Sequence, residues 1–325
     1  MKTILVTGGA GYIGSHACKA LARAGYTPVC YDNLERGHAW AVQWGPLEQG
    51  DILDRQRLDA VLQKYQPDAV MHFAAYAYVE ESVKDPDKYY KNNVEGSMTV
   101  LEAMRANGIN RFIFSSSCAV YGTPQEPLLK ENHPIAPINP YGAGKAAVEN
   151  KLLEYSNASA FRYISLRYFN AAGADPEGEI GEAHEPETHL IPLVLNTAMN
   201  QQEAITVYGD DYDTPDGTCI RDFIHVADLA DGHLRALRHL EQGNFSNIIN
   251  LGTSAGYSVK EIIHCARNIT GREIREKIMG RRAGDPPRLV ANRDYAEKIL
   301  GWKPQYSRIE NIIETAWRWH NHRDR

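Results

Sequence analysis

Cysteine is scarce in this sequence, and no stretch of it is long and apolar. The 325 residues include five cysteines without a Cys-x-x-Cys pair or close spacing, which fits neither a disulfide framework nor a zinc site. The run Ile4 to Val6 before the first glycines is too short for a signal peptide, and no later run approaches the ~20 apolar residues of a membrane span. We therefore expect an unexported, soluble protein of the reducing cytoplasm that has no membrane partner and binds no metal.

Basic residues are in the minority. Lys and Arg number 35 against 41 Asp and Glu, for a formal net charge of -6. Nucleic acids and anionic membranes attract clustered Lys and Arg, so neither is an expected partner. The chain is 43% hydrophobic and 23% charged, which is typical of globular rather than disordered proteins.

Short β-branched runs alternate with longer amphipathic stretches in the first half of the chain. The runs that we interpret as strands are Thr3 to Val6, Pro28 to Tyr31, Ala69 to Phe73, Arg111 to Phe114 and Tyr163 to Leu166. Because these runs lack polar alternation, they indicate strands buried on both faces of a sheet. The pattern predicts an α/β fold with a doubly wound parallel sheet of the Rossmann type.

The alternation of strand-like and helix-like segments becomes irregular after about residue 170. Loops rich in Gly, Pro and acidic residues occur there at 174–186 and 209–217. We expect residues 1–170 to form the Rossmann domain, with a return of the chain to it around residues 222–251. Residues 171–325 would form mainly a smaller C-terminal α/β lobe that binds the substrate.

A glycine-rich loop follows the first strand directly. Gly9, Gly11 and Gly14 satisfy G-x-G-x-x-G, and Gly8, Gly11 and Gly14 satisfy G-x-x-G-x-x-G. Such a loop brings backbone N–H groups against a pyrophosphate at the N-terminus of the next helix, and its last glycine lets helix and strand pack closely. The glycines alone are weak evidence, but a strand precedes them and an amphipathic helix follows. A tight turn without a ligand is the alternative.

An acid ends the second strand, where a ribose is commonly recognised. Asp32 lies 18 residues after Gly14, and a carboxylate there accepts a bond from a 2′-hydroxyl and repels a 2′-phosphate, which favours NAD over NADP. Arg36 is a counter-argument, although an Arg in a loop is usually solvated. Asp51 is a weaker candidate, because it could as well cap a helix that begins near Asp54 as contact an adenine.

A serine run and a Tyr-x-x-x-Lys motif come next. Tyr141 lies 24 residues after Ser117 and four before Lys145, and Pro140 suits a first helical position, so Tyr141 and Lys145 share one helix face. Lowering a tyrosine pKa from about 10 to about 7 requires about 4 kcal/mol, which an ammonium ~4 Å away supplies at an effective dielectric of 20. Tyr141 could then exchange a proton with a hydroxyl that Ser117 orients, while Lys145 also reaches the cofactor ribose.

Together these residues resemble the extended short-chain dehydrogenase/reductase family and, within it, the UDP-galactose 4-epimerases, also called UDP-glucose 4-epimerases. The similarity runs over essentially the whole chain. The matching strings are TGGAGYIGSH at 7–16, DNL at 32–34, HFAA at 72–75, NNV at 92–94, SSSCAVYG at 115–122, the Tyr141 to Lys145 motif, LRYFNAAG at 166–173, DGTCIRDFIHV at 216–226 and RRAGDP at 281–286.

The resemblance implies roles for individual residues. Ser117, Tyr141 and Lys145 would be catalytic. The cofactor would be bound by Gly8, Gly11, Tyr12, Ile13, Gly14, Asp32, Asn33, Asp51, Ile52, Phe73, Ala74, Asn92, Ser115, Tyr141, Lys145 and Tyr168, with Phe73, Asn92 and Tyr168 on the nicotinamide side. The UDP-sugar would be bound by Ser117, Tyr141, Asn170, His189, Leu190, Tyr208, Arg221, Arg282 and Asp285. Two arginines can clamp a pyrophosphate, and an acid can take ribose hydroxyls.

The implied reaction is the interconversion of UDP-glucose and UDP-galactose by inversion at C4 with tightly bound NAD. Carbon 4 has no neighbouring carbonyl, so a transient 4-keto intermediate explains the inversion better than deprotonation does. The family also implies a homodimer, joined here through helices at 87–106 and 141–154.

Three departures from the family pattern put a cofactor contact near Ala77 in doubt and, at His189 and Leu289, leave the substrate open. Ala77 stands where many members have Lys, His189 where several have Asn, and Leu289 at a position thought to gate N-acetyl sugars. UDP-N-acetylhexosamines and UDP-pentoses therefore remain alternatives.

Other function classes also remain. A 4,6-dehydratase would need Asp-Glu where this chain has Cys118-Ala119. A dehydrogenase that releases its ketone and a non-catalytic NAD sensor are further alternatives. The 12 histidines suggest no convincing ligand cluster, and His72 is interpreted as a satisfied core residue.

Overall fold

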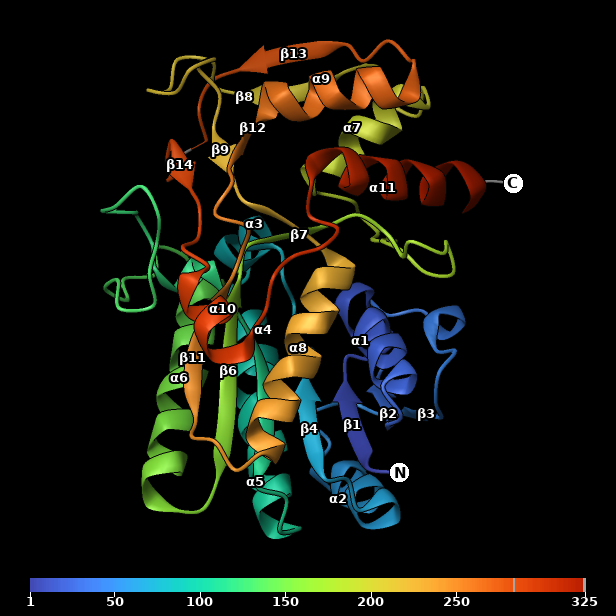
Figure 1. Cartoon of the computed structure of the whole chain (residues 1–325), viewed down its shortest axis with the longest axis vertical. Coiled ribbons are helices and arrows are strands. Elements are labelled where there is room, and N and C mark those ends of the chain that lie inside the picture. The colour runs from blue at the N-terminus through green and yellow to red at the C-terminus, as the bar shows by residue number, and fades with distance from the viewer. Residues whose placement is uncertain (283, 324–325) are drawn as a thin grey trace.

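A seven-stranded parallel sheet forms the larger part of the computed structural model, which describes residues 1–282 and 284–323 (Figure 1). Its strands are β1 (Thr3–Thr7), β2 (Thr27–Asp32), β3 (Leu47–Gln49), β4 (Ala69–His72), β5 (Arg111–Ser117), β6 (Arg162–Tyr168) and β11 (Asn247–Leu251), in the order β11-β6-β5-β4-β1-β2-β3. All neighbouring strands are parallel. The predicted doubly wound sheet and its five predicted strands are confirmed.

Helices cover both faces of this sheet, and together they form what we call the sheet lobe. Figure 1 shows α1 (Tyr12–Arg23) and α8 (Val226–Glu241) on one face, and α2 (Arg55–Tyr65), α5 (Gly96–Ala106) and α6 (Pro140–Ala158) on the other. Short helices connect β4 to α5: α3 (Val79–Lys84), α4 (Pro86–Tyr89) and the π-helix η2 (Tyr90–Glu95). Two 3₁₀ turns, η1 (Ala39–Ala41) and η3 (Cys118–Val120), follow β2 and β5.

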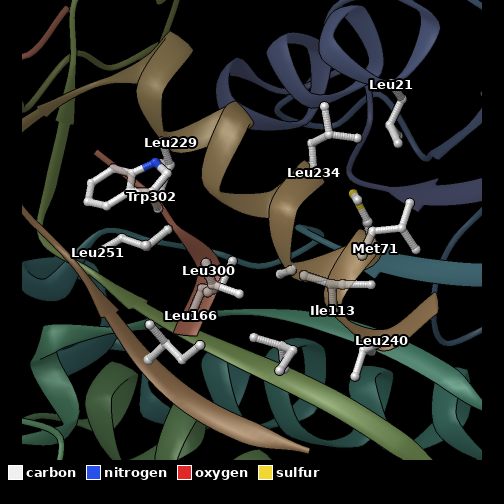
Figure 2. Close-up of a cluster of buried hydrophobic side chains, with 14 of the residues drawn as sticks. Leu21, Met71, Ile113, Leu166, Leu229, Leu234, Leu240, Leu251, Leu300 and Trp302 are labelled. Atoms are coloured by element: carbon white, nitrogen blue, oxygen red, sulfur yellow. The ribbon is translucent and has the colours of Figure 1, made fainter. Parts of the chain in front are cut away.

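Alternate residues of each central strand enter opposite cores. Ile4 and Val6 of β1 belong to one core, and Leu5 belongs to the other. Figure 2 shows the first core, where α1 and α8 pack on the sheet through Leu21, Met71, Ile113, Leu166, Leu234 and Leu240. The second core packs the sheet against α2, α5 and α6 through Val70, Phe112, Leu58, Leu62, Leu101 and Leu152. This two-sided burial explains the apolar runs in the sequence.

Small sheets and three helices form a second lobe. In it β8 (Ile205–Tyr208) pairs with β13 (Glu276–Met279), and β9 (Ile220–Arg221) lies between β12 (Tyr257–Ser258) and β14 (Arg288–Leu289). The helices α7 (Leu190–Ala198), α9 (Val259–Thr270) and α11 (Ile309–Arg323) enclose a third core. Between the lobes lie the pair β7 (Asn170–Ala172) and β10 (Phe223–His225), and α10 (Asp294–Leu300) packs beside β11.

Helix starts follow their capping residues. Pro140 occupies the first turn of α6, as predicted, and the side chain of Asn139 accepts a hydrogen bond from the Gly142 amide. Asp54 caps α2 by accepting from the Arg57 amide. The alternative reading of Asp51 as the helix cap is therefore wrong. None of the helices within residues 1–282 and 284–323 combines the length and apolar character that crossing a membrane requires.

Candidate active site

The carboxyl ends of the central strands meet at one edge of the sheet. Thr7 pairs in register with Tyr31 and His72, Ser117 with Tyr168, and Tyr168 with Leu251. The glycine loop after β1 and the serine at the end of β5 therefore lie along the same edge. This is where open parallel sheets bind ligands.

The glycines of the loop serve different purposes. Gly8 has φ +73°, and a Cβ there would lie 2.5 Å from the Ala74 nitrogen; a Cβ on Gly14 would lie 2.1 Å from the Gly8 oxygen. Both positions therefore exclude side chains because backbone packs against them. Gly11 is the N-cap of α1, and a Cβ there would meet only the Gly8 oxygen, at 3.3 Å. The helix N-terminus at Gly11 and Tyr12 is thus open to a phosphate, so the loop fits a dinucleotide.

Asp32 is held at the end of β2 by the loops beside it. Its carboxylate accepts hydrogen bonds from the Ala10 amide (3.0 Å) and the Leu34 amide (2.9 Å), and burial raises its pKa. Arg36 was the one nearby residue that favoured NADP over NAD. It donates to the Glu185 carbonyl (2.8 Å), and its guanidinium lies over the Tyr78 ring at 5.3 Å. The guanidinium is therefore committed to other partners.

The predicted adenine-side residues also lie together. The Asn33 side chain donates to the Asp51 carboxylate at 3.0 Å, and the other Asp51 oxygen accepts from the Leu53 amide. Ile52 is buried in the second core beside Gly96, where a Cβ would come within 2.5 Å of it. Asp51 thus makes a tight turn that positions Asn33.

The predicted catalytic residues are buried side by side. Ser117, Tyr141 and Lys145 are 8%, 7% and 4% exposed. The Lys145 ammonium donates to the Ser115 carbonyl at 2.7 Å and lies 5.8 Å from the centre of the Tyr141 ring. The Ser117 hydroxyl accepts from the Ala119 amide at 3.1 Å. Strand β5 and helix α6 therefore bring the three side chains to one place.

Burial has the largest effect on both titratable groups of this trio. It raises the pKa of Tyr141 to about 12, against a lowering by its hydrogen bond with Ser117, and it lowers the pKa of Lys145 to about 7. From the sequence, the Lys145 ammonium was expected to have the dominant influence on the Tyr141 pKa, whereas in the structure burial has the largest effect. The site has a low dielectric, so an added positive charge would act strongly on Tyr141.

His233 of α8 is a site residue that the sequence did not indicate. One ring nitrogen bonds with the Ser115 hydroxyl (2.9 Å) and the other with the Leu229 carbonyl (2.8 Å). Its ring lies 4.7 Å from that of Phe73 and 6.1 Å from that of Tyr168, centre to centre. Burial lowers the pKa of His233 to about 4, so a neutral imidazole supports these neighbours. In the sequence, His233 is a single histidine among apolar residues of a helix, so nothing there indicates a role in the site.

The remaining cofactor candidates have partners of their own. Ile13 packs on the first core and Ala74 on the second, and the Tyr12 hydroxyl donates to the Gly173 carbonyl at 2.6 Å. Asn92 lies in the π-helix and donates to the Asn93 side chain, which in turn binds the backbone of Tyr76. His72 bonds with Thr7 and Ser97, which confirms it as a satisfied core residue.

Four of the predicted UDP-sugar residues form two pairs in the second lobe. The Arg282 guanidinium lies 3.9 Å from the centre of the Tyr208 ring, and Arg221 donates to the Asp285 carboxylate at 3.0 Å. Arg281, by contrast, is bound to Asp211 at 2.7 Å. The two neighbouring arginines therefore have different partners, and only Arg282 faces an aromatic ring that the family pattern also names.

The charge of Arg221, in the second lobe, acts on Cys118, the residue after Ser117. Burial raises the pKa of the Cys118 thiol to about 12, and the charge of Arg221 acts in the opposite direction. Arg221 therefore lies near the residue that follows Ser117. Asn170, two residues after Tyr168, donates to the Asp222 carbonyl at 2.8 Å, which joins β7 to the same region.

A segment that we call the strap, residues 181–189, crosses between the phosphate loop and α7. Its backbone is held by His38 at Ala183 (2.6 Å), Trp319 at Glu182 (2.9 Å) and Tyr78 at Pro186 (3.1 Å). At its end His189 precedes Leu190, the first residue of α7. The strap overlaps the acidic loop at 174–186, which in the sequence was marked only by its composition.

The strap also brings together two histidines and two glutamates. His189 contacts Glu182 (2.9 Å) and Glu187 (3.0 Å), and His184 contacts Glu182 at 3.0 Å. Burial alone would lower the pKa values of both histidines, but the carboxylates raise that of His184 to about 9 and that of His189 to about 10. The sequence suggested no ligand cluster among the histidines, and the structure brings two of them together with two glutamates in an arrangement that could hold a metal ion.

Comparison with known proteins agrees with this geometry. A family model described as the NAD dependent epimerase/dehydratase family matches residues 4–252. The chain belongs to this family. This match and the relatives described next confirm its predicted cofactor, NAD, and its class as an NAD-dependent isomerase.

The similarity to other members of the NAD dependent epimerase/dehydratase family extends over almost the whole chain. A UDP-glucose 4-epimerase of Rhizobium leguminosarum bv. trifolii is 53% identical over 98% of this chain and 97% of its own. The crystal structure of UDP-glucose 4-epimerase from Brucella ovis in complex with NAD is 51% identical, with a TM-score of 0.96 over 98% of each chain. The enzyme from Bifidobacterium longum, solved with NAD+ and UDP, is 36% identical, with a TM-score of 0.94 over 98% of each chain. The resemblance to UDP-glucose 4-epimerases is confirmed.

Proposed function

We propose that this protein interconverts UDP-glucose and UDP-galactose by inverting carbon 4 of the sugar, with NAD retained in the sheet lobe. The observation that carries the proposal is the buried trio Ser117, Tyr141 and Lys145 at the sheet edge that also carries the phosphate loop. The likeness to UDP-glucose 4-epimerases supports the choice of reaction.

Residues of the sheet lobe would hold the cofactor. The amides at the start of α1 would bind the pyrophosphate, Asp32 the adenosine ribose, and Lys145 the other ribose. When bound, NAD supplies the hydride acceptor and donor that make carbon 4 transiently a ketone. The Tyr141 oxygen takes the proton of the C4 hydroxyl and later returns one, while the Ser117 hydroxyl orients that oxygen. Burial of all three side chains keeps water from the ketone.

Residues of the second lobe would hold the UDP part of the substrate. Arg221 and Arg282 are the candidate pyrophosphate ligands, Asp285 would accept from the ribose, and Tyr208 would pack beside it. Asn170, His189 and Leu190 would border the sugar. Binding energy placed on UDP leaves the sugar free to turn and present its other face, which inversion requires.

We further propose a homodimer located in the cytoplasm. Val83, Tyr90 and Leu153 on α3, η2 and α6 are 61%, 58% and 51% exposed, and these elements lie side by side. The π-helix η2 and α6 overlap the ranges 87–106 and 141–154 that the family pattern implies for the dimer, and α3 lies just before the first of them. A second copy would cover these apolar side chains.

Proton NMR of the purified protein tests the reaction. UDP-galactose, UDP-N-acetylgalactosamine and UDP-xylose are incubated separately without added NAD, and the anomeric signals are followed. We expect UDP-glucose to form from UDP-galactose, and the other two arms measure how strictly the pocket selects its sugar. Absence of any 4-epimer, even with added NAD, would contradict the proposal and favour a dehydratase or a non-catalytic NAD sensor.

A further inference from the structure

Four ligand-type side chains of the strap meet with the spacing of a metal site. One donor atom from each of Glu182, His184, Glu187 and His189 lies within 4.8 Å of all the others. The contacts between a histidine Nδ1 and a glutamate carboxylate oxygen measure 2.9, 3.0, 3.0 and 3.7 Å, and the two contacts of Glu187 use different oxygens of its carboxylate. A tetrahedron with metal–ligand bonds of about 2.0–2.1 Å has edges of about 3.3–3.4 Å. The observed separations bracket that value.

The donors are held in place by contacts outside the cluster. Glu182 is 3% exposed, and its carbonyl accepts from the Trp319 indole at 2.9 Å. The His184 ring packs edge-on against Tyr12 at 6.1 Å and Tyr78 at 6.0 Å between centres. The amides of Thr188 and His189 both donate to Glu187 at 2.8 Å. The arrangement therefore does not depend on flexible surface side chains alone.

We propose that Glu182, His184, Glu187 and His189 bind one divalent transition-metal ion of the zinc type. Two imidazole nitrogens and two carboxylate oxygens are the donor set that Zn²⁺ accepts, and two carboxylates balance its charge. The ion takes the place of the proton on each Nδ1, so binding releases any proton carried there. Four protein ligands close the coordination sphere, as in structural sites, and the ion ties the strap beside Tyr12 of the phosphate loop.

A second acidic group nearby provides a contrast. Asp175, Glu177 and Glu179 also lie within 4.8 Å of one another, but all three contact the Lys19 ammonium, with Asp175 at 2.6 Å and Glu177 at 3.2 Å. A cation of the protein already neutralises this group, and it offers only oxygen donors. It carries no proposal, and it supplies a matched control.

Zinc titration of the NAD-containing protein tests the proposal. After removal of metals with a chelator, we expect calorimetry to show one Zn²⁺ per chain for the wild type and for the control Glu177→Gln. His184→Asn and Glu187→Gln should each bind at least ~10-fold more weakly. A wild type that takes up no Zn²⁺ at the site, or variants that bind like the wild type, would overturn the proposal in favour of two protonated imidazoles paired with the carboxylates.

Cobalt substitution keeps the test decisive if a variant fails to fold, which circular dichroism would reveal. Co²⁺ bound to the metal-free wild type should give the intense visible absorption of a tetrahedral site, and one equivalent of Zn²⁺ should abolish it. A weak octahedral spectrum would count against the proposal. Neither readout depends on epimerase activity, so the outcome is independent of the proposed reaction.

Discussion

The two lobes hold their site residues in opposite ways. In the sheet lobe, Tyr141 and Lys145 are 7% and 4% exposed, and the lysine is fixed by a backbone carbonyl. In the second lobe, the Asp285 side chain is 34% exposed and Tyr208 is 37% exposed, and their side chains contact Arg221 and Arg282, respectively. The proposed catalytic groups are thus buried, whereas two of the proposed UDP-side groups are more exposed. Changes in the first lobe should therefore cost stability or rate, and changes in the second should cost affinity.

The largest expected effect concerns charged pairs in the two lobes. Arg167 makes a buried double hydrogen bond with Glu149, at 2.6 and 3.0 Å. Arg167→Met leaves that carboxylate buried without its counter-ion and should cost about 3–5 kcal/mol of unfolding free energy. Arg281→Met, which breaks an exposed pair with Asp211 in the second lobe, should cost less than about 1 kcal/mol. Urea unfolding of both variants measures the difference. Equal losses of unfolding free energy would contradict the contrast between the two lobes.

Removing the proposed base should affect rate without affecting binding. Tyr141→Phe keeps the buried ring and should fold and retain NAD, but kcat should fall at least ~100-fold because the proton acceptor is gone. Tyr163→Phe, at a buried tyrosine of β6 elsewhere in the sheet lobe, is the matched control and should retain activity. Steady-state kinetics decides, and near-normal turnover of Tyr141→Phe would defeat the catalytic assignment.

Removing a proposed phosphate ligand should affect substrate binding more than the catalytic rate. Arg282→Met in the second lobe should raise KM for the UDP-sugar about 10-fold, with kcat changed less, since a charge-assisted bond is lost equally in the ground and transition states. Arg281→Met controls for the loss of a neighbouring arginine that already has a partner, and its KM should stay near the wild-type value. A fall in kcat for Arg282→Met with KM unchanged would show that the lobes do not divide the work in this way.

The smallest expected effect is a pH dependence specific to the sheet lobe. Burial lowers the pKa of His233 to about 4, below its unfolded value of about 6.5, so this residue contributes stability that is lost as pH falls from 6.5 toward 4. His233→Gln should therefore reduce the stability loss between pH 7 and pH 5 by about 1–2 kcal/mol. The exposed His264→Gln serves as control. An unchanged loss in His233→Gln would show that the buried imidazole does not titrate as proposed.

The sheet lobe could be predicted from the sequence because its signals are local. Apolar runs, a glycine loop and an acid after the second strand depend on neighbours in the chain, and the structure places them as expected. Helix spacing correctly predicted that Tyr141 and Lys145 lie close together. The effect of burial on the Tyr141 pKa could not be predicted, because it depends on packing across the sheet. The assigned roles of these residues remain predictions.

The strap and His233 could not be predicted in the same way. The partners of His233, Ser115 and Phe73, lie more than one hundred residues away in sequence, so no spacing indicates them. The strap has no periodic pattern, and its contacts with Tyr12 and Tyr78 come from other elements. The π-helix at Tyr90–Glu95 likewise has no composition that separates it from the α-helix that it interrupts.

Deuterium retention at carbon 4 tests the central claim most directly. UDP-galactose labelled with deuterium at C4 is converted by the purified protein in ordinary water without added NAD, and the product is examined by NMR. If the hydrogen leaves and returns within one buried site, the UDP-glucose formed carries the deuterium at C4. Product with hydrogen from solvent at that position would contradict transient oxidation by retained NAD.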